Sequence, residues 1–269
     1  MLTTRFLLAK LQMEHIFCYR GRRRKMRALD SVPRNWDAAY TDVIRRIDES
    51  ERTDEREIAM LTFSWLLRAQ RTLTMDELLQ AVAVDEGADD SEFDTTMLYT
   101  PNDIIECCKS LVVYDKISGS IRFTHFTVQE FFANHPPNQL PSPKHLALSC
   151  LKYLTLDAFN RPCSSGESMS ERVATYKFGS YAAQFWGHHV EHVESDPEVQ
   201  EAVRLFLDST NNVRSMLQLQ AYGTSYMSVS FVEGQTLLHL CARNGLATAC
   251  KLILHKRPSE SEADMARYV

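Results

Sequence analysis

The sequence predicts a mainly α-helical protein in which one β-hairpin interrupts the helices. Apolar residues recur at helical spacing along most of the 269 residues. Several helical stretches begin with a capping residue that is followed by proline or by an acidic side chain. Residues 111–124, by contrast, contain two short β-type runs separated by a Ser-Gly turn, which is typical of a hairpin.

Residues 1–50 are expected to form a small helical subdomain. The apolar residues of 5–17 recur at helical spacing, and the basic run RGRRRKMR follows at 20–27. Asn35 is placed to cap the next helix. One face of that helix carries an apolar stripe formed by Trp36, Tyr40, Val43, Ile44 and Ile47.

Residues 51–134 have the element order of a winged-helix domain. A first helical stripe is followed by Thr74, which is placed to cap a second helix, with Glu77 closing the capping box. Thr100 is placed to cap a third helix that has proline at its first position. The hairpin at 111–124 would then supply a small, two-stranded wing.

The winged helix is a poor candidate for reading DNA. Its third helix, expected at 101–110, offers Asp103 and Glu106 against Lys109 alone, and such a surface repels the phosphate backbone. The chain carries a formal charge of −5, although residues 1–29 hold eight Lys or Arg against one acidic residue. The body of the chain is therefore acidic, which argues against a large nucleic-acid footprint. We expect the third helix to pack internally.

Residues 142–222 are predicted to form a helical domain. Ser142 and Pro143 give a helix-start signal after a proline-rich linker. The helices of this domain are expected at 143–156, 172–190, 197–208 and 211–220, with a polar loop at 161–170.

Residues 225–257 are predicted to contain one ankyrin-like unit, with the sequence GQTLLHLCARNGLATACKLIL at 234–254. The residues typical of such a unit are Thr236, Leu238, His239, Ala242 and Gly245, whereas Leu237 and Leu246 depart from the pattern. Thr236 and His239 are expected to have structural roles at the helix start. One repeat cannot bury both of its faces, so it must pack on the preceding helices or on further repeats.

Together these segments resemble the carboxy-terminal part of a fungal-type NACHT and ankyrin signalling protein, a relative of NOD-like receptors. The resemblance is carried by RFLLAKLQME, ALDSVPRNWDAAYTDVIRRI, LTFSWLLRAQRTLTMDELLQAVAV, LVVYDKISGSIRFTHFTVQEFF and AAQFWGHH, in that order along the chain. It implies a winged helix, a helical domain and a first ankyrin repeat, in a non-enzymatic regulatory and protein-interaction region of a signal-transduction switch.

The nucleotide-binding core of that family is missing from the sequence. The nine glycines never lie within seven positions of one another, which excludes the phosphate loop as well as GxGxxG and GxSxG. HExxH is missing too. We therefore expect no enzyme activity, no cofactor and no metal from this chain alone, and a NACHT nucleotide-binding half would have to be supplied in the same polypeptide or in trans.

His125 is the candidate site residue. In some members of the resembled family, the histidine of the F-x-H element faces the β-phosphate of bound ADP, and His125 stands at that position. It would bind nucleotide only where a nucleotide-binding half is present; otherwise it is a junction residue before a helix. We expect Thr127 to cap that helix, with Glu130 closing the capping box.

Two further groups of residues have alternative interpretations. His188 and His192 lie at i and i+4, as zinc ligands do, but no third ligand is evident, which favours a surface or interface histidine cluster. The cations Arg22, Arg23, Arg24 and Lys25 favour a solvated helix end, with nuclear localisation or nucleic-acid binding as the alternative.

The partners we expect are proteins that bind the helical and ankyrin-like surfaces. No apolar stretch in the sequence approaches the length of about 18–20 residues that crosses a bilayer, so we expect a cytoplasmic protein without a membrane partner. Nucleic-acid binding by the winged helix, through the basic segment 20–27, is the alternative function.

Overall fold

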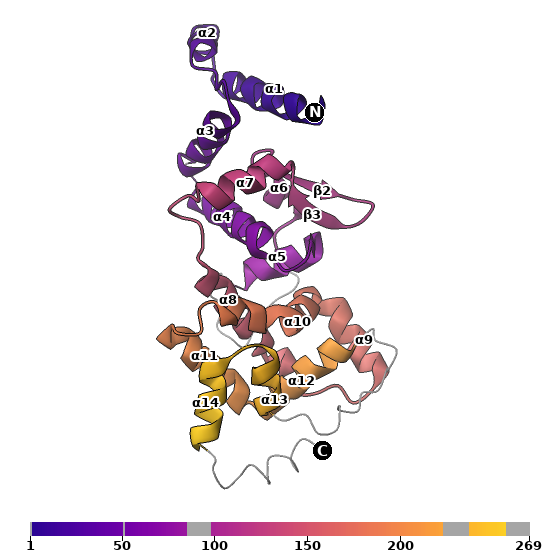
Figure 1. Cartoon of the computed structure of the whole chain (residues 1–269). Coiled ribbons are helices and arrows are strands. Elements are labelled where there is room, and N and C mark those ends of the chain that lie inside the picture. Colours follow the sequence, from indigo (N-terminus) through magenta and orange to yellow (C-terminus); the bar gives the residue numbers. More distant parts are fainter. Residues whose placement is uncertain (1, 51, 85–97, 223–236, 257–269) are drawn as a thin grey trace. The chain divides into compact units, whose positions relative to one another are not determined.

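The computed structural model describes residues 2–50, 52–84, 98–222 and 237–256. It is mainly helical and has one small antiparallel sheet (Figure 1), which confirms the predicted fold class. The chain divides into two compact units. Unit 1 comprises residues 1–75 and 99–140, and unit 2 comprises residues 76–98 and 141–269.

Unit 1 begins with three helices that follow from the sequence signals. Their bounds are α1 Leu2–Phe17, α2 Arg22–Asp30 and α3 Trp36–Asp48. Asn35 caps α3 as predicted, because its side-chain oxygen accepts a hydrogen bond from the Ala38 N–H at 2.8 Å. Most of the predicted stripe of α3 is buried, with Tyr40, Val43 and Ile47 almost fully covered, whereas Trp36 at its start is half-buried.

The winged-helix elements occur in the predicted order. They are α4 Thr53–Arg68, β1 Leu73–Thr74, α5 Met75–Ala83, α6 Pro101–Cys107, β2 Val112–Asp115, β3 Ser120–Phe123 and α7 Phe126–Asn134. Thr100 caps α6 in a capping box with Asp103, and Pro101 takes the first helical position, as expected. The boundary between the units falls at the start of α5, which belongs to unit 2 from Asp76 onward.

The sheet has three strands in the order β1-β3-β2, all antiparallel. The predicted wing had only two strands. The additional strand, β1, is two residues long and pairs Leu73 with Ile121. Such a short strand has no visible alternation of apolar and polar residues, so the sequence pattern could not reveal it.

The core of unit 1 is aromatic where the sheet meets its helices. Phe63 of α4, Phe123 of β3 and Phe132 of α7 are buried together. The ring centroids of Phe63 and Phe132 lie 4.7 Å apart, and those of Phe123 and Phe132 lie 5.5 Å apart. This cluster fixes the wing and α7 against α4.

Unit 2 continues after the proline-rich linker with a helical layer. Its elements are α8 Pro143–Leu154, a 3-10 turn η1 Asp157–Phe159, α9 Gly166–Thr175, α10 Lys177–Glu191, α11 Pro197–Asp208 and α12 Thr210–Ala221. The expected loop at 161–170 was partly wrong, and so was the single helix at 172–190. Ser165 forms a capping box with Ser168, which starts α9 inside the expected loop.

The core of unit 2 lies between α8 and α10 and is closed and aromatic. Its fully buried members include Tyr153, Phe159, Phe178, Tyr181, Trp186 and Phe206. Gln80 of α5 is one of the buried polar groups of this unit. Gln80 Oε1 accepts from the Tyr153 hydroxyl at 2.5 Å and from the Phe178 N–H at 3.1 Å. Gln80 Nε2 donates to the Thr175 carbonyl at 2.8 Å, so the amide is satisfied on both sides.

The last described elements are the helix pair α13 Leu237–Arg243 and α14 Ala247–Lys256. Gly245 joins them at a φ of +69°, a conformation that favours glycine. Glu194 caps α14, because its carboxylate accepts from the N–H groups of Thr248 and Ala249 at 2.8 and 3.0 Å. A helix pair thus occupies the place of the ankyrin-like unit, whereas Thr236 lies outside the described residues.

Candidate functional site at His125

His125 lies between β3 and α7 and caps the helix. Its Nδ1 accepts a hydrogen bond from the Thr127 N–H at 3.3 Å and lies 2.8 Å from Thr127 Oγ1. Because Nδ1 accepts, the neutral ring carries its proton on Nε2. The expectation that Thr127 caps α7 was therefore wrong: the helix begins at Phe126, and the half-buried His125 is the cap.

The hydroxyl of Thr127 has a different role, which explains that error. It lies 2.7 Å from the hydroxyl of Tyr40 on α3, a residue 87 positions away in sequence. One arrangement of protons satisfies both contacts: Tyr40 donates to Thr127 Oγ1, which donates to Nδ1 of His125. Thr127 thus connects the start of α7 to α3, while Glu130 is exposed.

Two rings hold the imidazole in place. The ring of Trp36 on α3 is nearly parallel to that of His125, with an interplanar angle of 11° and a centroid distance of 6.4 Å. The Phe126 ring lies 4.4 Å from the imidazole. Tyr40 is almost fully buried, and burial raises the pKa of its hydroxyl, which therefore stays protonated as a donor.

This arrangement leaves Nε2 as the proton-bearing atom of an imidazole whose orientation is fixed. An N–H donor of this kind suits a phosphate oxygen or a protein carbonyl. The contacts around His125 are those of a positioned hydrogen-bond donor.

The histidines at the end of α10 separate into exposed and buried residues. His188 and His192 are exposed, and α10 ends at Glu191, just before His192. His189 between them is buried, and its Nε2 lies 2.9 Å from the Tyr181 hydroxyl. Burial lowers the pKa of His189 to about 4. Within the described ranges of the chain, no group of three His, Cys, Asp or Glu residues could hold a metal ion.

The helix in the place of a DNA-recognition helix has an acidic exposed face. In α6, Ile104 is buried and the exposed side chains are those of Asn102, Asp103 and Glu106. This face carries no cation within α6, so it is unsuited to the phosphate backbone of DNA. The basic residues of the run 20–27 lie instead on α2 and the turn before it.

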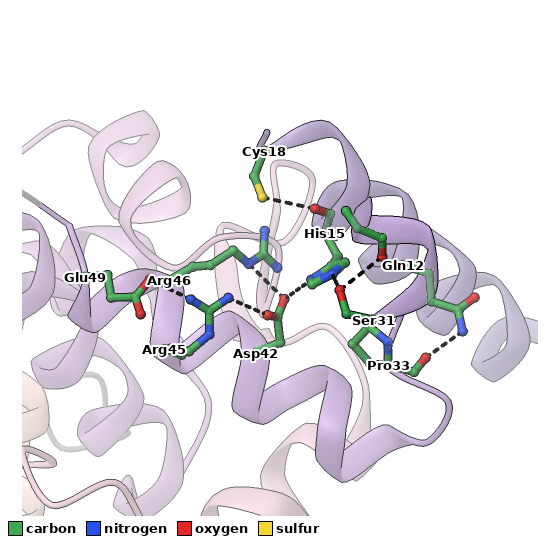
Figure 2. A network of polar contacts seen from close by, with 10 residues as sticks. Gln12, His15, Cys18, Ser31, Pro33, Asp42, Arg45, Arg46 and Glu49 are labelled. Carbon is green, nitrogen blue, oxygen red and sulfur yellow. Dashed lines mark hydrogen bonds and ion pairs between the residues drawn. The ribbon is translucent and has the colours of Figure 1, made fainter. Parts of the chain in front are cut away.

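A buried polar network joins α1–α3, and no motif or spacing in the sequence predicts it (Figure 2). His15 of α1 is buried, and its Nδ1 lies 2.9 Å from a carboxylate oxygen of Asp42 on α3. Its Nε2 lies 3.2 Å from the hydroxyl of Ser31, which follows α2. Arg45 and Arg46 contact the same Asp42 carboxylate at 2.8 and 3.2 Å. The network therefore joins α1, the end of α2 and α3.

A chain of contacts from a serine through a histidine to an aspartate also occurs in hydrolases. The contacts of Ser31, His15 and Asp42 nevertheless differ from those of a catalytic triad. The Ser31 hydroxyl has one proton and donates it to the Ala28 carbonyl at 3.2 Å, so that proton is not offered to His15. Burial opposes ionisation of Asp42, yet hydrogen bonds from Arg45 and His15 lower its pKa overall. We interpret the network as a structural joint.

Comparison with known proteins identifies the class of one domain. Residues 49–142 match the winged helix domain of GPI inositol-deacylase. The chain therefore contains a winged helix domain of this type, as its element order predicted. Neither this match nor the relative described next names a NACHT domain or an ankyrin repeat.

A relative extends the similarity beyond that domain. Azaphilone pigments biosynthesis cluster protein L of Monascus ruber is 30% identical over 202 residues, which cover 68% of this chain. The aligned part is 41% of the length of that protein, so this chain corresponds to less than half of it. No solved structure matches the chain.

Proposed function

We propose that this chain is a regulatory, protein-interaction region of a NACHT-type signal-transduction switch and has no enzymatic activity of its own. The observation that carries the proposal is the position of His125 at the junction of the winged helix with α7. There its ring is held by Thr127 and, through Thr127, by Tyr40 of α3. A winged helix related to that of GPI inositol-deacylase supplies the domain context.

In this proposal His125 reports the occupancy of a nucleotide site that lies in another domain. A nucleotide-binding half, in the same polypeptide or in trans, would present a phosphate to the Nε2–H of His125. Loss of that contact would free the junction and allow the winged-helix and helical domains to rearrange. Such a rearrangement exposes surfaces for protein partners, and its direction is set by which state the nucleotide binds more tightly.

The remaining surfaces favour protein binding over base reading. The exposed face of α6 is acidic, so the winged helix would serve as a packing and transmission module. The carboxy-terminal helix pair α13 and α14 is the second surface for partners in this proposal. We expect the winged helix and this helix pair to act in the cytoplasm. Among the described residues, no helix is both long enough and apolar enough to pass through a bilayer.

The test uses the native protein assembled with its nucleotide-binding half and a fluorescent ADP. We expect His125→Leu to accelerate ADP release by about tenfold or more, because one charge-assisted hydrogen bond to phosphate is lost. His125→Asn is the matched variant, since asparagine is a good helix cap yet does not reproduce the imidazole Nε2–H. Release rates that are unchanged in His125→Leu would contradict the proposal. If His125→Leu releases ADP faster but His125→Asn releases it at the rate of the parent, His125 has a capping role only.

A further inference from the structure

One exposed surface of unit 1 combines cationic and apolar side chains. It is formed by α2 and the neighbouring face of α1, and we name it the basic-apolar surface. Its members are Arg22, Lys25, Met26 and Leu29, which lie at i, i+3, i+4 and i+7 on one face of α2, together with Phe17 and Met13 of α1. Arg23, Arg24 and Arg27 lie on the flanks of this face and add to its positive charge. The function proposed above makes no use of this surface.

The charges of α2 are placed where a helix tolerates them least. Its first turn holds only cations, and it has no acidic residue there. Gly21 precedes it at a φ of +87° and provides no side-chain cap. The amino-terminal end of a helix carries a partial positive charge. Cations at this end are therefore repelled by the helix dipole as well as by one another. An anionic partner would neutralise both the arginines and the helix end.

The apolar members of the surface are unusually exposed for their type. Met26 and Phe17 are 59% exposed, and Leu29 and Met13 are 50% exposed. Met26 and Leu29 share a face of α2 with Arg22, at i+4 and i+7. Met13 and Phe17 are likewise one turn apart on α1.

A contact joins the two helices within this surface. Lys25 Nζ lies 4.7 Å above the centre of the Phe17 ring, so the lysine and the ring form a cation–π pair at the meeting of α1 and α2. Cationic and apolar side chains therefore share one face of α2, and this face meets α1 at Phe17. Asp30, at the opposite end of α2, is the acidic residue of that helix.

We propose that the basic-apolar surface binds peripherally to a membrane surface that contains anionic phospholipid. The arginines would contact lipid phosphates, and the four exposed apolar side chains would enter the interfacial region. A nucleic acid offers the same phosphates, but it would leave those apolar side chains in water. The expectation of no membrane partner rested on the missing spanning stretch, and that argument does not apply to peripheral binding.

The experiment is co-sedimentation of the whole chain with vesicles of phosphatidylcholine, with or without about 30% phosphatidylserine. We expect binding at least about tenfold stronger with phosphatidylserine, and weaker as salt is raised. The charge variant replaces Arg22, Arg23, Arg24 and Lys25 by Gln, a good helix former that also relieves the charge conflict at the start of α2. It should lose most of the binding while keeping its helical circular dichroism.

The apolar variant, Met26→Ser with Leu29→Ser, separates lipid from nucleic acid. It should weaken vesicle binding about fivefold, because the interfacial contribution of two side chains is removed. Leu205→Ser in unit 2, with a similarly exposed leucine at 55%, is its matched control and should bind as the parent does. The variant that carries Lys116→Gln and Arg122→Gln in the wing is the control for charge, and it should bind vesicles as the parent does.

Three results would overturn the proposal. The first is equal binding to vesicles with and without phosphatidylserine, and the second is no binding to either. The third is vesicle binding that the apolar variant does not weaken, accompanied by tight binding to a DNA duplex that only the charge variant abolishes. That third result would assign the surface to nucleic acid instead.

Discussion

The three amino-terminal helices of unit 1 and the α8–α10 core of unit 2 are stabilised in different ways. The α8–α10 core is closed by aromatic rings, and the buried amide of Gln80 at this core is neutral and hydrogen-bonded on both sides. The helices α1–α3 combine an ionic network around Asp42 with buried apolar side chains, among them Leu11 of α1 and Val43 of α3. The comparison indicates that the α8–α10 core depends mainly on apolar burial, with buried His189 as an acid-sensitive exception, whereas α1–α3 depend on charged groups.

The physical reason lies in how each kind of contact responds to its surroundings. Apolar burial is non-directional and changes little with protonation or salt. An ion pair that remains partly accessible, like that of Asp42 with Arg45, is screened by salt and depends on the charge of each partner. Regions that change conformation are generally those of lower local stability, which here would be the ionic network of α1–α3.

The largest effect is expected from opening the aromatic core. Phe178 is fully buried, with its ring 5.1 Å from Tyr153 and 5.4 Å from Tyr181. Phe178→Ala should lower the stability of unit 2 by about 3–5 kcal/mol, because it removes apolar contacts and leaves a cavity. Hydrogen exchange resolved by segment should show faster exchange throughout α8 and α10. A loss below about 1 kcal/mol would mean that the core is not closed as described.

Acidification should weaken unit 2 by a slightly smaller amount. The folded-state pKa of His189 is about 4 against 6.5 for an unperturbed histidine, because the ring is buried. The unfolded chain therefore binds more protons between these values, so stability is present above about pH 6.5 and is lost as the pH falls toward 4. The loss is about 3 kcal/mol at most.

The matched variants for this prediction are His189→Gln and His188→Gln. His189→Gln cannot titrate in this range and should show a flatter dependence of unit 2 stability on pH between about 6.5 and 4. His188 is exposed, so His188→Gln should retain the slope of the parent. The same slope in His189→Gln as in the parent would show that other groups cause the acid loss.

An intermediate loss of stability, confined to unit 1, is expected when the charge of Asp42 in the ionic network is removed. Asp42→Asn removes the charge that pairs with His15, Arg45 and Arg46, and it should cost about 2 kcal/mol. Exchange should increase in α1–α3 while α8 and α10 stay unchanged. Arg204→Gln, which breaks an exposed ion pair on α11, is the control and should alter neither region. Increased exchange in α8 and α10 after Asp42→Asn would contradict the separation of the two regions.

The smallest effect concerns the link between α3 and α7. Tyr40→Phe removes the hydroxyl that lies 2.7 Å from Thr127 Oγ1 and should cost about 1 kcal/mol, the usual net value of one hydrogen bond. Amide hydrogens at the start of α7 should exchange faster, whereas those of α6 should not. Equal protection of α7 in the parent and the variant would show that the His125 cap holds this helix without the contact to α3.

Most helix caps follow from local signals as predicted, although the Ser165 capping box that starts α9 was missed, whereas features that depend on distant residues were not predicted. Asn35 and Thr100 cap their helices as predicted, because an N-cap acts on the next turn of its own helix. Thr127 looked like a cap with equal clarity, but Tyr40, far away in sequence, engages its hydroxyl and leaves the cap to His125. Tertiary contact decided between two capping residues that are both plausible locally.

The ionic joint shows the same limit. His15, Ser31 and Asp42 lie on three different elements, and no spacing rule connects them. Strand β1 was missed because two residues are too few for a period-two pattern. The ankyrin-like unit and the domain boundaries remain predictions, although a helix pair occurs where the pattern indicated.

The proposed regulatory role is tested most directly by isolating the native protein that carries this chain and measuring its mass and bound nucleotide. We predict that ADP is recovered with it in a ratio of about 1:1, held by a nucleotide-binding half in the same polypeptide or in a stable partner, and that His125→Leu lowers this recovery. Native protein that carries no nucleotide and co-purifies with no nucleotide-binding partner would contradict the account.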